Sequence, residues 1–217
     1  MSLVSDVIAQ ARLELSDKAS ARWSDADMIL WIRKAIARIT PILYRNSVQF
    51  ARSASTIATV AGQEKYALPA DFGTPYGLFR ESTHTKLAQR NEDTWETIVS
   101  AGESTNWAIL YDGTAQKAFV KGIPTSVYDL TLYYYPLIDT SAYTTASTMP
   151  WGGKLDQMIG DYVRVCCLNA DEQSIATDVQ MMSDIENNIL NFYGGQSPLV
   201  IQRAGWNPTS AGERGYY

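Results

Sequence analysis

"RWSDADMILWIRKAIARITPILYR", residues 22–45, has the pattern of an amphipathic helix with a defined start. Ser24 is placed to accept a hydrogen bond from the backbone N–H of Asp27, and Asp25 adds negative charge at the positive end of the helix dipole. Trp23, just before the cap, is placed to pack forward onto the helix. Apolar residues then recur at helical spacing: Met28, Ile29, Ile32, Ala35, Ile36, Ile39, Ile42 and Leu43. We therefore predict a helix that begins near residue 25 and buries one stripe.

The opposite face of this helix is basic, with two apolar exceptions. Its basic residues are Arg33, Lys34, Arg38 and Arg45. Leu30 and Ala37 lie among them, either as scattered surface residues, which are common, or as a second contact surface against another copy or another protein. Pro41 has no backbone N–H and crowds the carbonyl four residues before it, so we predict a kink or a break at residues 37–40.

The composition is that of an ordinary globular protein. The chain has 217 residues, of which 46% are hydrophobic and 19% charged, and this balance excludes wholesale disorder. Cys166 and Cys167 are adjacent, so a bridge between them on a helix would be badly strained and no disulfide is expected. Residues 1–10 lack the pattern of a signal peptide, and no stretch reaches the roughly 18 apolar residues of a membrane span. We therefore expect a protein made and folded in a reducing cytoplasm.

The net charge of −5 is unevenly distributed along the chain. Residues 1–50 hold seven basic and five acidic residues, whereas residues 154–193 hold two basic and seven acidic ones. Binding to nucleic acid through its phosphates needs clustered Lys and Arg, which this sequence does not show. The acidic region is either a solvated surface or a surface past which DNA moves without binding, and the sequence leaves both interpretations open.

Helical periodicity occurs at both ends of the chain, with β patterns between. Residues 3–15 predict a first helix, with Ser2 or Ser5 as its cap. Strands are predicted at residues 65–68, 76–81, 105–111 and 128–136, and Asp112-Gly113 is typical of a hairpin turn. After Pro150 two more apolar stripes follow at helical spacing. Their members are Leu155, Ile159, Tyr162, Cys166 and Ala170, then Ile175, Val179, Met182, Ile185, Ile189 and Phe192.

These elements predict an α+β fold. Each of the four helices has a single apolar stripe, and packing all four together is the economical way to bury them. We therefore predict a bundle of about four helices, two N-terminal and two C-terminal, with an inserted, mainly antiparallel β subdomain and an extended C-terminal tail. The predicted boundaries are 1–47 and 150–195 for the two helical pairs, 48–149 for the β subdomain and 196–217 for the tail.

No set of residues in the sequence predicts catalysis. His84 is the single histidine and lies in a polar segment, so it is expected in a surface loop and cannot form a triad alone. The adjacent cysteines have the wrong spacing for zinc. Acid pairs such as Glu92 with Asp93 are expected at helix caps or on solvated faces rather than in a glycosidase site. We predict no catalytic residues, no cofactor, no metal and no enzyme activity.

Several short motifs occur in a familiar order. They are "RWSDADMILWIRKAIARI" after a first helix, then "GQEKYALPADF", then "LTLYYYPLI", then "MPWGGKLDQMIGDYV" at the start of a helix. In this order the chain, over about residues 3–193, resembles the head-to-tail adaptor proteins of tailed bacteriophages, the neck or connector proteins that include the tail tubular protein A of short-tailed phages. Each motif is weak alone, and the order and spacing carry the resemblance.

The resemblance implies a structural virion protein. Such proteins form a ring, usually of twelve copies, beneath the portal, join the DNA-filled capsid to the tail and line the channel through which DNA is ejected. The implied partners are the portal protein, a tail or second neck protein and other copies of the chain, with DNA passing without specific binding and no membrane involved. Applied to this sequence, the ring places the basic face of residues 22–45 against acidic helices of a neighbouring copy. The residues of this hypothetical subunit interface are Leu30, Arg33, Lys34, Arg38, Asp156, Asp161, Asp178, Asp184 and Glu186.

The C-terminal tail keeps large apolar residues despite its Gly, Pro and Ser. They are Leu199, Val200, Ile201, Trp206, Tyr216 and Tyr217. Tails without structure usually lack such residues, so we predict that this one packs onto its own chain or onto a partner, the portal being the partner that the resemblance implies. The competing function is a carbohydrate- or receptor-binding module associated with the phage tail. It would use exposed aromatic residues of the β region, namely Trp95, Trp107 and Tyr133 to Tyr135.

Overall fold

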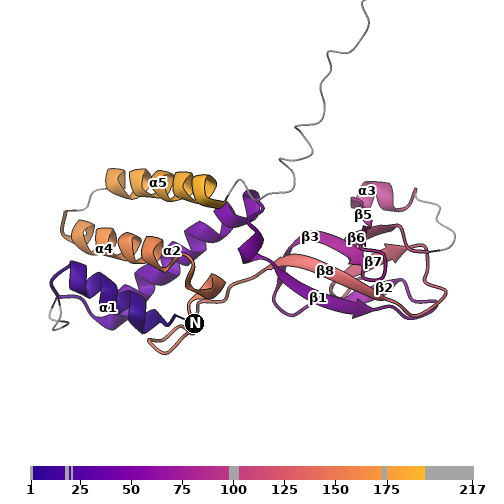
Figure 1. Cartoon of the computed structure of the whole chain (residues 1–217), viewed down its shortest axis with the longest axis horizontal. Helices are drawn as coiled ribbons and strands as arrows, with labels where there is room; N and C mark the ends of the chain where they lie inside the picture. Colours follow the sequence, from indigo (N-terminus) through magenta and orange to yellow (C-terminus); the bar gives the residue numbers. More distant parts are fainter. Residues whose placement is uncertain (1, 18–19, 21, 98–102, 173–174, 194–217) are drawn as a thin grey trace, which may run out of the picture. The chain divides into compact units, whose positions relative to one another are not determined.

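The computed structural model of the chain describes residues 2–17, 20, 22–97, 103–172 and 175–193. The described residues form two compact units, a helical unit from residues up to 50 and from 140 to 193, and a β unit from residues 51–139. The first contains the long helices and the second contains the two sheets, so the α+β fold predicted from the sequence is confirmed. Figure 1 identifies the elements of both units by their labels.

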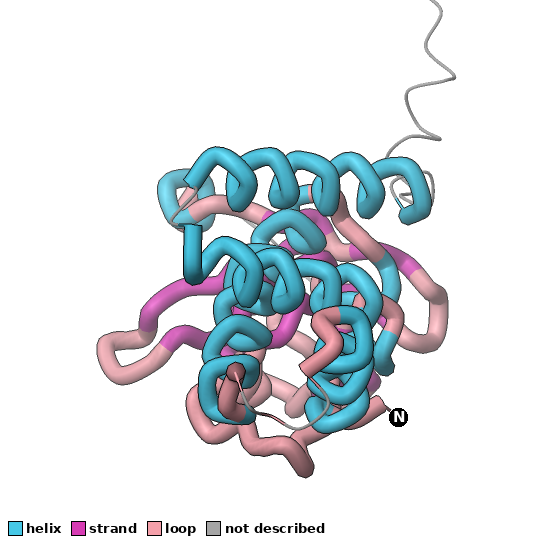
Figure 2. The backbone as a smooth tube through the Cα atoms, turned by 90° about the vertical axis from the view of Figure 1, so that its left-hand side faces the viewer, coloured by secondary structure: helices cyan, strands magenta, loops and turns pink. Residues whose placement is uncertain are grey.

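The helical unit is built from four helices that come from the two ends of the chain. They are α1 (Val4–Glu14), α2 (Asp25–Arg45), α4 (Asp156–Glu172) and α5 (Ile175–Tyr193). Helix α4 packs against α1, α2 and α5, and both views show α5 as an outer layer beside α4 (Figures 1 and 2). Thus the N-terminal and C-terminal helices share one core, as their apolar stripes predict. Its fully buried side chains include Val4, Met28, Ile32, Ile36, Ile39, Leu43, Leu155, Ile159, Tyr162, Val163 and Ile189.

The start of α2 follows the prediction closely. The Ser24 hydroxyl accepts from the Asp27 N–H at 3.2 Å, and the Asp27 carboxylate accepts from the Ser24 N–H at 3.2 Å, which completes a capping box. Trp23 packs forward onto Trp31, with ring centroids 5.3 Å apart. The helix does not break before Pro41, however: it runs as one element to Arg45. Packing of its apolar stripe outweighs the single backbone hydrogen bond that proline removes.

Three details of the other helices correct the sequence predictions. Neither serine caps α1: Leu3 is the capping residue, and its N–H donates to the Asp6 carboxylate at 2.8 Å. In α4 the fully buried thiol is Cys167, while Cys166 is half-buried. In the last turn of α5 the ring of Phe192 is 69% exposed. The stripe continues from Ile189 to Tyr193 instead, four residues on, and the Tyr193 ring lies 4.8 Å from the ring of Phe50.

The β unit contains two four-stranded sheets that share a core. In the first sheet the order is β1 (Ser53–Ala58), β8 (Asp129–Pro136), β3 (Phe72–Arg80) and β4 (Thr85–Lys86). In the second it is β2 (Lys65–Ala67), β7 (Gln116–Lys121), β6 (Asn106–Tyr111) and β5 (Ala88–Gln89), with the short helix α3 (Glu92–Trp95) after β5. All pairs are antiparallel except β5 with β6. The shared core contains Leu78, Leu130, Leu132 and Tyr134 from the first sheet and Tyr66, Trp107, Ala118 and Val120 from the second.

A close approach of backbones shapes the start of β3. The register with β8 shifts between Phe72 and Thr74, and a Cβ on the intervening Gly73 would lie 2.7 Å from the carbonyl oxygen of Tyr135. Only glycine therefore fits at this irregularity without moving the neighbouring strand. Beside it, the Tyr134 hydroxyl donates to the Asp71 carboxylate at 2.8 Å. Burial and this hydrogen bond raise the pKa of Tyr134 to about 12.

Candidate interaction surfaces

The basic face of α2 is only partly open to a partner. Leu30 is 60% exposed and Lys34 is exposed, whereas Arg33 and Arg38 are half-buried. Arg33 donates through Nη2 to the carbonyl oxygen of Tyr143 at 3.1 Å, and the Arg38 guanidinium lies 5.8 Å from the centre of the Tyr162 ring. The two arginines thus hold parts of the helical unit together. Of the predicted basic interface residues, Lys34 is the exposed one.

The predicted acidic interface residues also differ in what they contact. Asp184 on α5 is exposed and accepts from the Gln180 side chain at 3.1 Å. Glu186 forms an ion pair with Arg45, which links α5 to α2, and Asp161 lies 3.9 Å from Arg164 on its own helix. The side chain of Asp178 lies outside the described part of the chain.

Asp156, the first residue of α4, is the acid least suited to meeting a neighbour. Its side chain is half-buried, and burial raises its pKa, with the negative charge of Asp6 adding to the effect and a hydrogen bond with Ser2 opposing it. Its Oδ1 atom has no hydrogen-bond partner among the described residues. We infer that this carboxyl group acts within the helical unit, at the junction of α4 with the first residues of the chain.

A buried arginine ties α1 to α2, and sequence reasoning missed it. Arg12 is 7% exposed; its guanidinium contacts Asp17 Oδ2 at 3.0 Å, Asp25 Oδ1 at 2.6 Å and the Trp23 carbonyl oxygen at 2.8 Å. Asp17, itself 8% exposed, also accepts from the backbone N–H groups of Arg22 and Trp23. The available signal was a charged residue at the edge of the apolar stripe of α1, four positions after Ile8. This cluster fixes how the chain turns from α1 into α2.

The aromatic residues of the β unit contradict the prediction that they form an exposed binding surface. Trp95 is 3% exposed, Trp107 is fully buried, and Tyr134 and Tyr135 are 4% and 3% exposed. Only Tyr133 of this set is exposed, at 38%. The prediction is therefore wrong for four of its five residues. Trp107 and Tyr134 lie in the core between the two sheets, Trp95 on α3 packs against Phe119, and Tyr135 packs beside Tyr76 and Arg52. A stacking platform for sugars is not built from these side chains.

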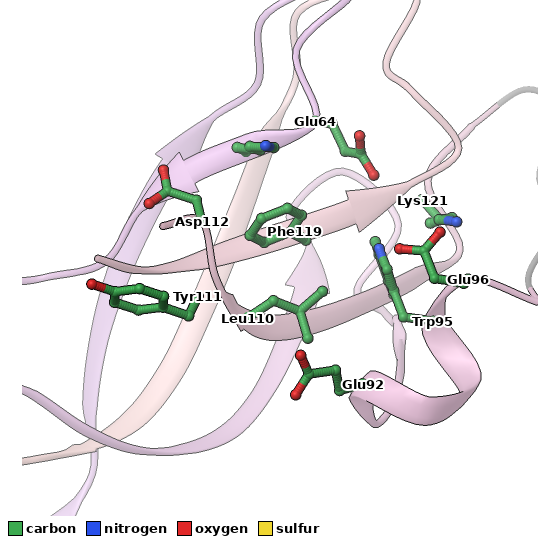
Figure 3. Close-up of a pocket in the computed structure, with 10 residues that line it drawn as sticks. Glu64, Glu92, Trp95, Glu96, Leu110, Tyr111, Asp112, Phe119 and Lys121 are labelled. Atoms are coloured by element: carbon green, nitrogen blue, oxygen red, sulfur yellow. The ribbon is translucent and has the colours of Figure 1, made fainter. Parts of the chain in front are cut away.

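A groove of about 550 Å³ lies on the outer side of the second sheet. Its apolar floor is Leu110, Trp95 and Phe119, and four carboxylates surround it (Figure 3): Glu64, Glu92, Glu96 and Asp112. The ammonium groups of Lys65 and Lys121 lie 5.1 Å from the ring centres of Phe119 and Trp95, so the chain's own cations cover the two aromatic rings. Lys117 pairs with Asp112 at 2.5 Å and is the main cause of its lowered pKa. One of the four carboxylates, Asp112, is therefore paired with a lysine of the same chain.

Two uncharged loops form a tip at one end of the first sheet. The loops of residues 59–63 and 122–128 are tied together there, since the buried Thr59 hydroxyl donates to the Tyr128 carbonyl at 2.8 Å and the Gly62 N–H donates to the Pro124 carbonyl at 3.0 Å. The tip exposes three branched aliphatic side chains: Val60 at 49%, Ile123 at 50% and Val127 at 71%. It lies at the end of the sheet opposite to the entry and exit of the chain, because β1 runs toward it and β8 runs away from it. Exposed apolar clusters of this kind mark contact sites between proteins.

Within the described residues the structure contains no arrangement typical of a catalytic or metal site. No group of three or more His, Cys, Asp or Glu is placed to hold a metal ion there. His84 is exposed in a turn with φ of 51°, as its polar surroundings predict. Burial, reinforced by the neighbouring Cys166, raises the pKa of Cys167 to about 12, which disfavours the reactive thiolate. No described helix combines the length and the hydropathy that crossing a lipid bilayer requires.

The predicted residues of the C-terminal tail, residues 199–217, lie outside the described part of the chain. A search among curated proteins finds no match to the sequence. Residues 2–182 match the family described as SU10 adaptor protein. That match begins before α1, passes through the whole β unit and ends within α5, so it includes both units of the fold. The chain therefore belongs to the SU10 adaptor protein family.

Proposed function

We propose that this protein is a structural component of a phage virion, a neck adaptor that forms a ring of twelve copies between the portal and the tail. The observation that carries the proposal is the match of residues 2–182 to the SU10 adaptor protein family. In this role the chain joins capsid to tail, lines the channel for DNA ejection and performs no catalysis. It binds the portal, a tail or second neck protein and its own copies.

The helical unit suits a ring in which each copy meets two neighbours. Arg12, Arg33 and Arg38 make contacts inside the unit. Leu30 and Lys34 on α2 and Asp184 on α5 remain exposed. We propose that these exposed residues form the subunit interface, with Arg33, Arg38, Asp161 and Glu186 supporting them from within the helical unit. The apolar tip at Val60, Ile123 and Val127 is proposed to contact the next protein of the tail.

Reversing one exposed charge tests the proposed subunit interface. Lys34→Glu should raise the concentration needed for ring assembly by about two- to fivefold per contact, because an exposed ion pair contributes about 0.2–1 kcal/mol. Combining it with Asp184→Lys should restore assembly. Rings formed in the presence of portal are counted by electron microscopy at low and moderate salt, and unaltered circular dichroism confirms the fold. Equal assembly by the wild type and Lys34→Glu at low salt would contradict an ion pair between Lys34 of one copy and Asp184 of its neighbour.

Removing the C-terminal tail tests its proposed docking onto the portal. A chain ending at residue 195 should lose affinity for purified portal by about a hundredfold or more, because several large apolar contacts would be lost together. Val127→Asp, at the tip of the β unit, is the matched control and should bind portal normally. Binding is measured by biolayer interferometry, and copies on the portal are counted by electron microscopy. If the shortened chain binds as well as the full chain, the anchor lies elsewhere.

A further inference from the structure

The edge of the first sheet at β1 has none of the usual protection against pairing with another strand. Figure 1 shows β1 along the outer side of this sheet, and among the described residues it pairs only with β8. The strand is six residues long, contains no charge and no proline, and keeps an unbroken register from Ser53 to Ala58. Natural proteins rarely leave such an edge uncovered.

The other three sheet edges are protected in the ways that proteins normally use. Strand β2 is three residues long and includes the exposed Lys65, and β4 is two residues long and ends at the exposed Lys86. Strand β5 has two residues. Short strands and charged side chains both discourage further pairing. Among the edges that the structure describes, the one along β1 is thus the exception.

The backbone groups that β1 offers at this edge follow from its pairing with β8. Directly after the strand, the Thr59 N–H donates to the Tyr128 carbonyl oxygen at 2.9 Å, and these two residues continue the register of β1 with β8. Hydrogen-bonded positions alternate along an antiparallel strand, so the odd-numbered residues of β1 bond to β8. The N–H and C=O groups of Ala54, Thr56 and Ala58 therefore point away from β8. Within the described residues these groups have no hydrogen-bond partner.

Side chains and charge leave this edge accessible. The side chains of Ala54, Thr56 and Ala58 are exposed and too small to obstruct an added strand. Arg52 is the nearest charge, but its guanidinium lies 3.6 Å from the ring centre of Tyr76 and donates to the Tyr135 hydroxyl at 3.1 Å. It therefore lies over the face of the sheet, on the side toward β3. No charge on β1 itself repels a second edge of the same kind.

We propose that β1 pairs antiparallel with β1 of a second copy of this chain, about a two-fold axis at Thr56. This register places Thr56 opposite Thr56 of the second copy, and Ala54 opposite Ala58 of the second copy. Every outward N–H then meets an outward C=O, because the order of donors and acceptors along the edge is complementary to itself in the antiparallel direction. Any other antiparallel register leaves outward groups of both copies unpaired. The two first sheets join into one continuous sheet.

This pairing goes beyond the proposed ring and does not rest on it. In a cyclic ring each copy is related to the next by rotation about one axis, so neighbours meet through two different surfaces. Two identical β1 edges meet about a two-fold axis instead, so their pairing forms in the free protein. The experiments use the full chain without portal, and their results therefore do not depend on the ring or on portal binding.

Sedimentation of the free protein over a series of concentrations tests the pairing. The wild type should show a monomer–dimer equilibrium. Thr56→Pro should raise the dissociation constant of the dimer about tenfold or more, because proline removes the central outward donor from both copies. Its bonds to β8 remain, since the N–H of residue 56 points away from that strand. Thr56→Val is the matched control: it keeps the N–H and the branched side chain, and it should dimerise like the wild type.

Charges introduced at the two ends of the strand test the register. A chain with Ala54→Lys and Ala58→Glu places opposite charges across the axis, whereas a chain with Ala54→Lys and Ala58→Lys places like charges there. The dissociation constant of the dimer should be about tenfold lower for the first chain, because each dimer contains two such pairs. This comparison needs no proline, so it also decides the question if Thr56→Pro fails to fold.

Amide hydrogen exchange locates the contact. The amides of Ala54, Thr56 and Ala58 should exchange more slowly as the protein concentration rises, while the odd-numbered amides of β1 stay unchanged because they bond to β8. A wild type that remains monomeric at every concentration would overturn the proposal. A dimer with the same dissociation constant in both charged chains would also overturn it, since the two copies would then meet through another surface.

Discussion

Replacing Arg12 with methionine is expected to lower the free energy of unfolding of the helical unit by about 3–5 kcal/mol, because removal of one partner leaves buried charge uncompensated. Arg12 is the shared partner of Asp17 and Asp25, at 3.0 and 2.6 Å, and Asp17 is 8% exposed. Methionine keeps much of the apolar stem of arginine. The decrease in the free energy of unfolding therefore reports the removal of the guanidinium rather than the creation of a cavity. Urea denaturation followed by circular dichroism at 222 nm provides the measurement.

Arg45→Met is the matched control for this experiment. Arg45 also pairs with a carboxylate on another element, Glu186 of α5, but its side chain is 64% exposed. An exposed pair contributes about 0.2–1 kcal/mol, so the same substitution should cost far less here. Adding Asp17→Asn to Arg12→Met should recover part of the loss, since the amide can be buried at lower cost than the carboxylate. Similar decreases in the free energy of unfolding for Arg12→Met and Arg45→Met would show that burial does not determine how strongly Arg12 binds its carboxylate partners.

The features that the sequence predicted best depend on interactions between near neighbours in the chain. The capping box joins Ser24 to Asp27, three residues on, and both hydrogen bonds are present. The hairpin at Asp112 is likewise local, since its carboxylate accepts from the N–H groups of Thr114 and Ala115 at 3.0 Å. Residues three or four apart on a helix or in a turn meet whatever the rest of the fold does, so their pattern alone is sufficient evidence.

The features that the sequence did not predict depend on contacts between distant elements. The burial of Arg12 depends on Asp17, Trp23 and Asp25, which all contact one guanidinium. The burial of Cys167 rather than Cys166 depends on which side of α4 meets α1 and α2. A helical stripe defines a face to within about 100°, one residue's rotation, so it cannot separate adjacent positions. Of the predicted interface residues, those with contacts inside the unit could be recognised only from the structure.

The burial of Trp107 leads to the second large effect, because this residue was also one of the five candidates for a sugar-stacking surface. Its side chain is fully buried between the two sheets, in the core that includes Leu78, Leu132 and Val120. Trp107→Ala should destabilise the β unit by about 3–5 kcal/mol through lost burial and the cavity left behind. Native-state hydrogen exchange of the β7 amides measures this loss, and the α4 amides serve as the control within the same molecule.

Trp107→Phe separates a core role from a ligand-binding role. The Nε1–H of Trp107 has no hydrogen-bond partner among the described residues, so phenylalanine removes an unpaired donor while keeping most of the apolar ring. We expect a loss of only about 1 kcal/mol, from the smaller volume of the ring. A tryptophan that stacked on a ligand at the surface would behave differently: alanine would then leave exchange at β7 nearly unchanged. That outcome would contradict the shared core of the two sheets, on which the rigidity of the β unit and the position of its tip depend.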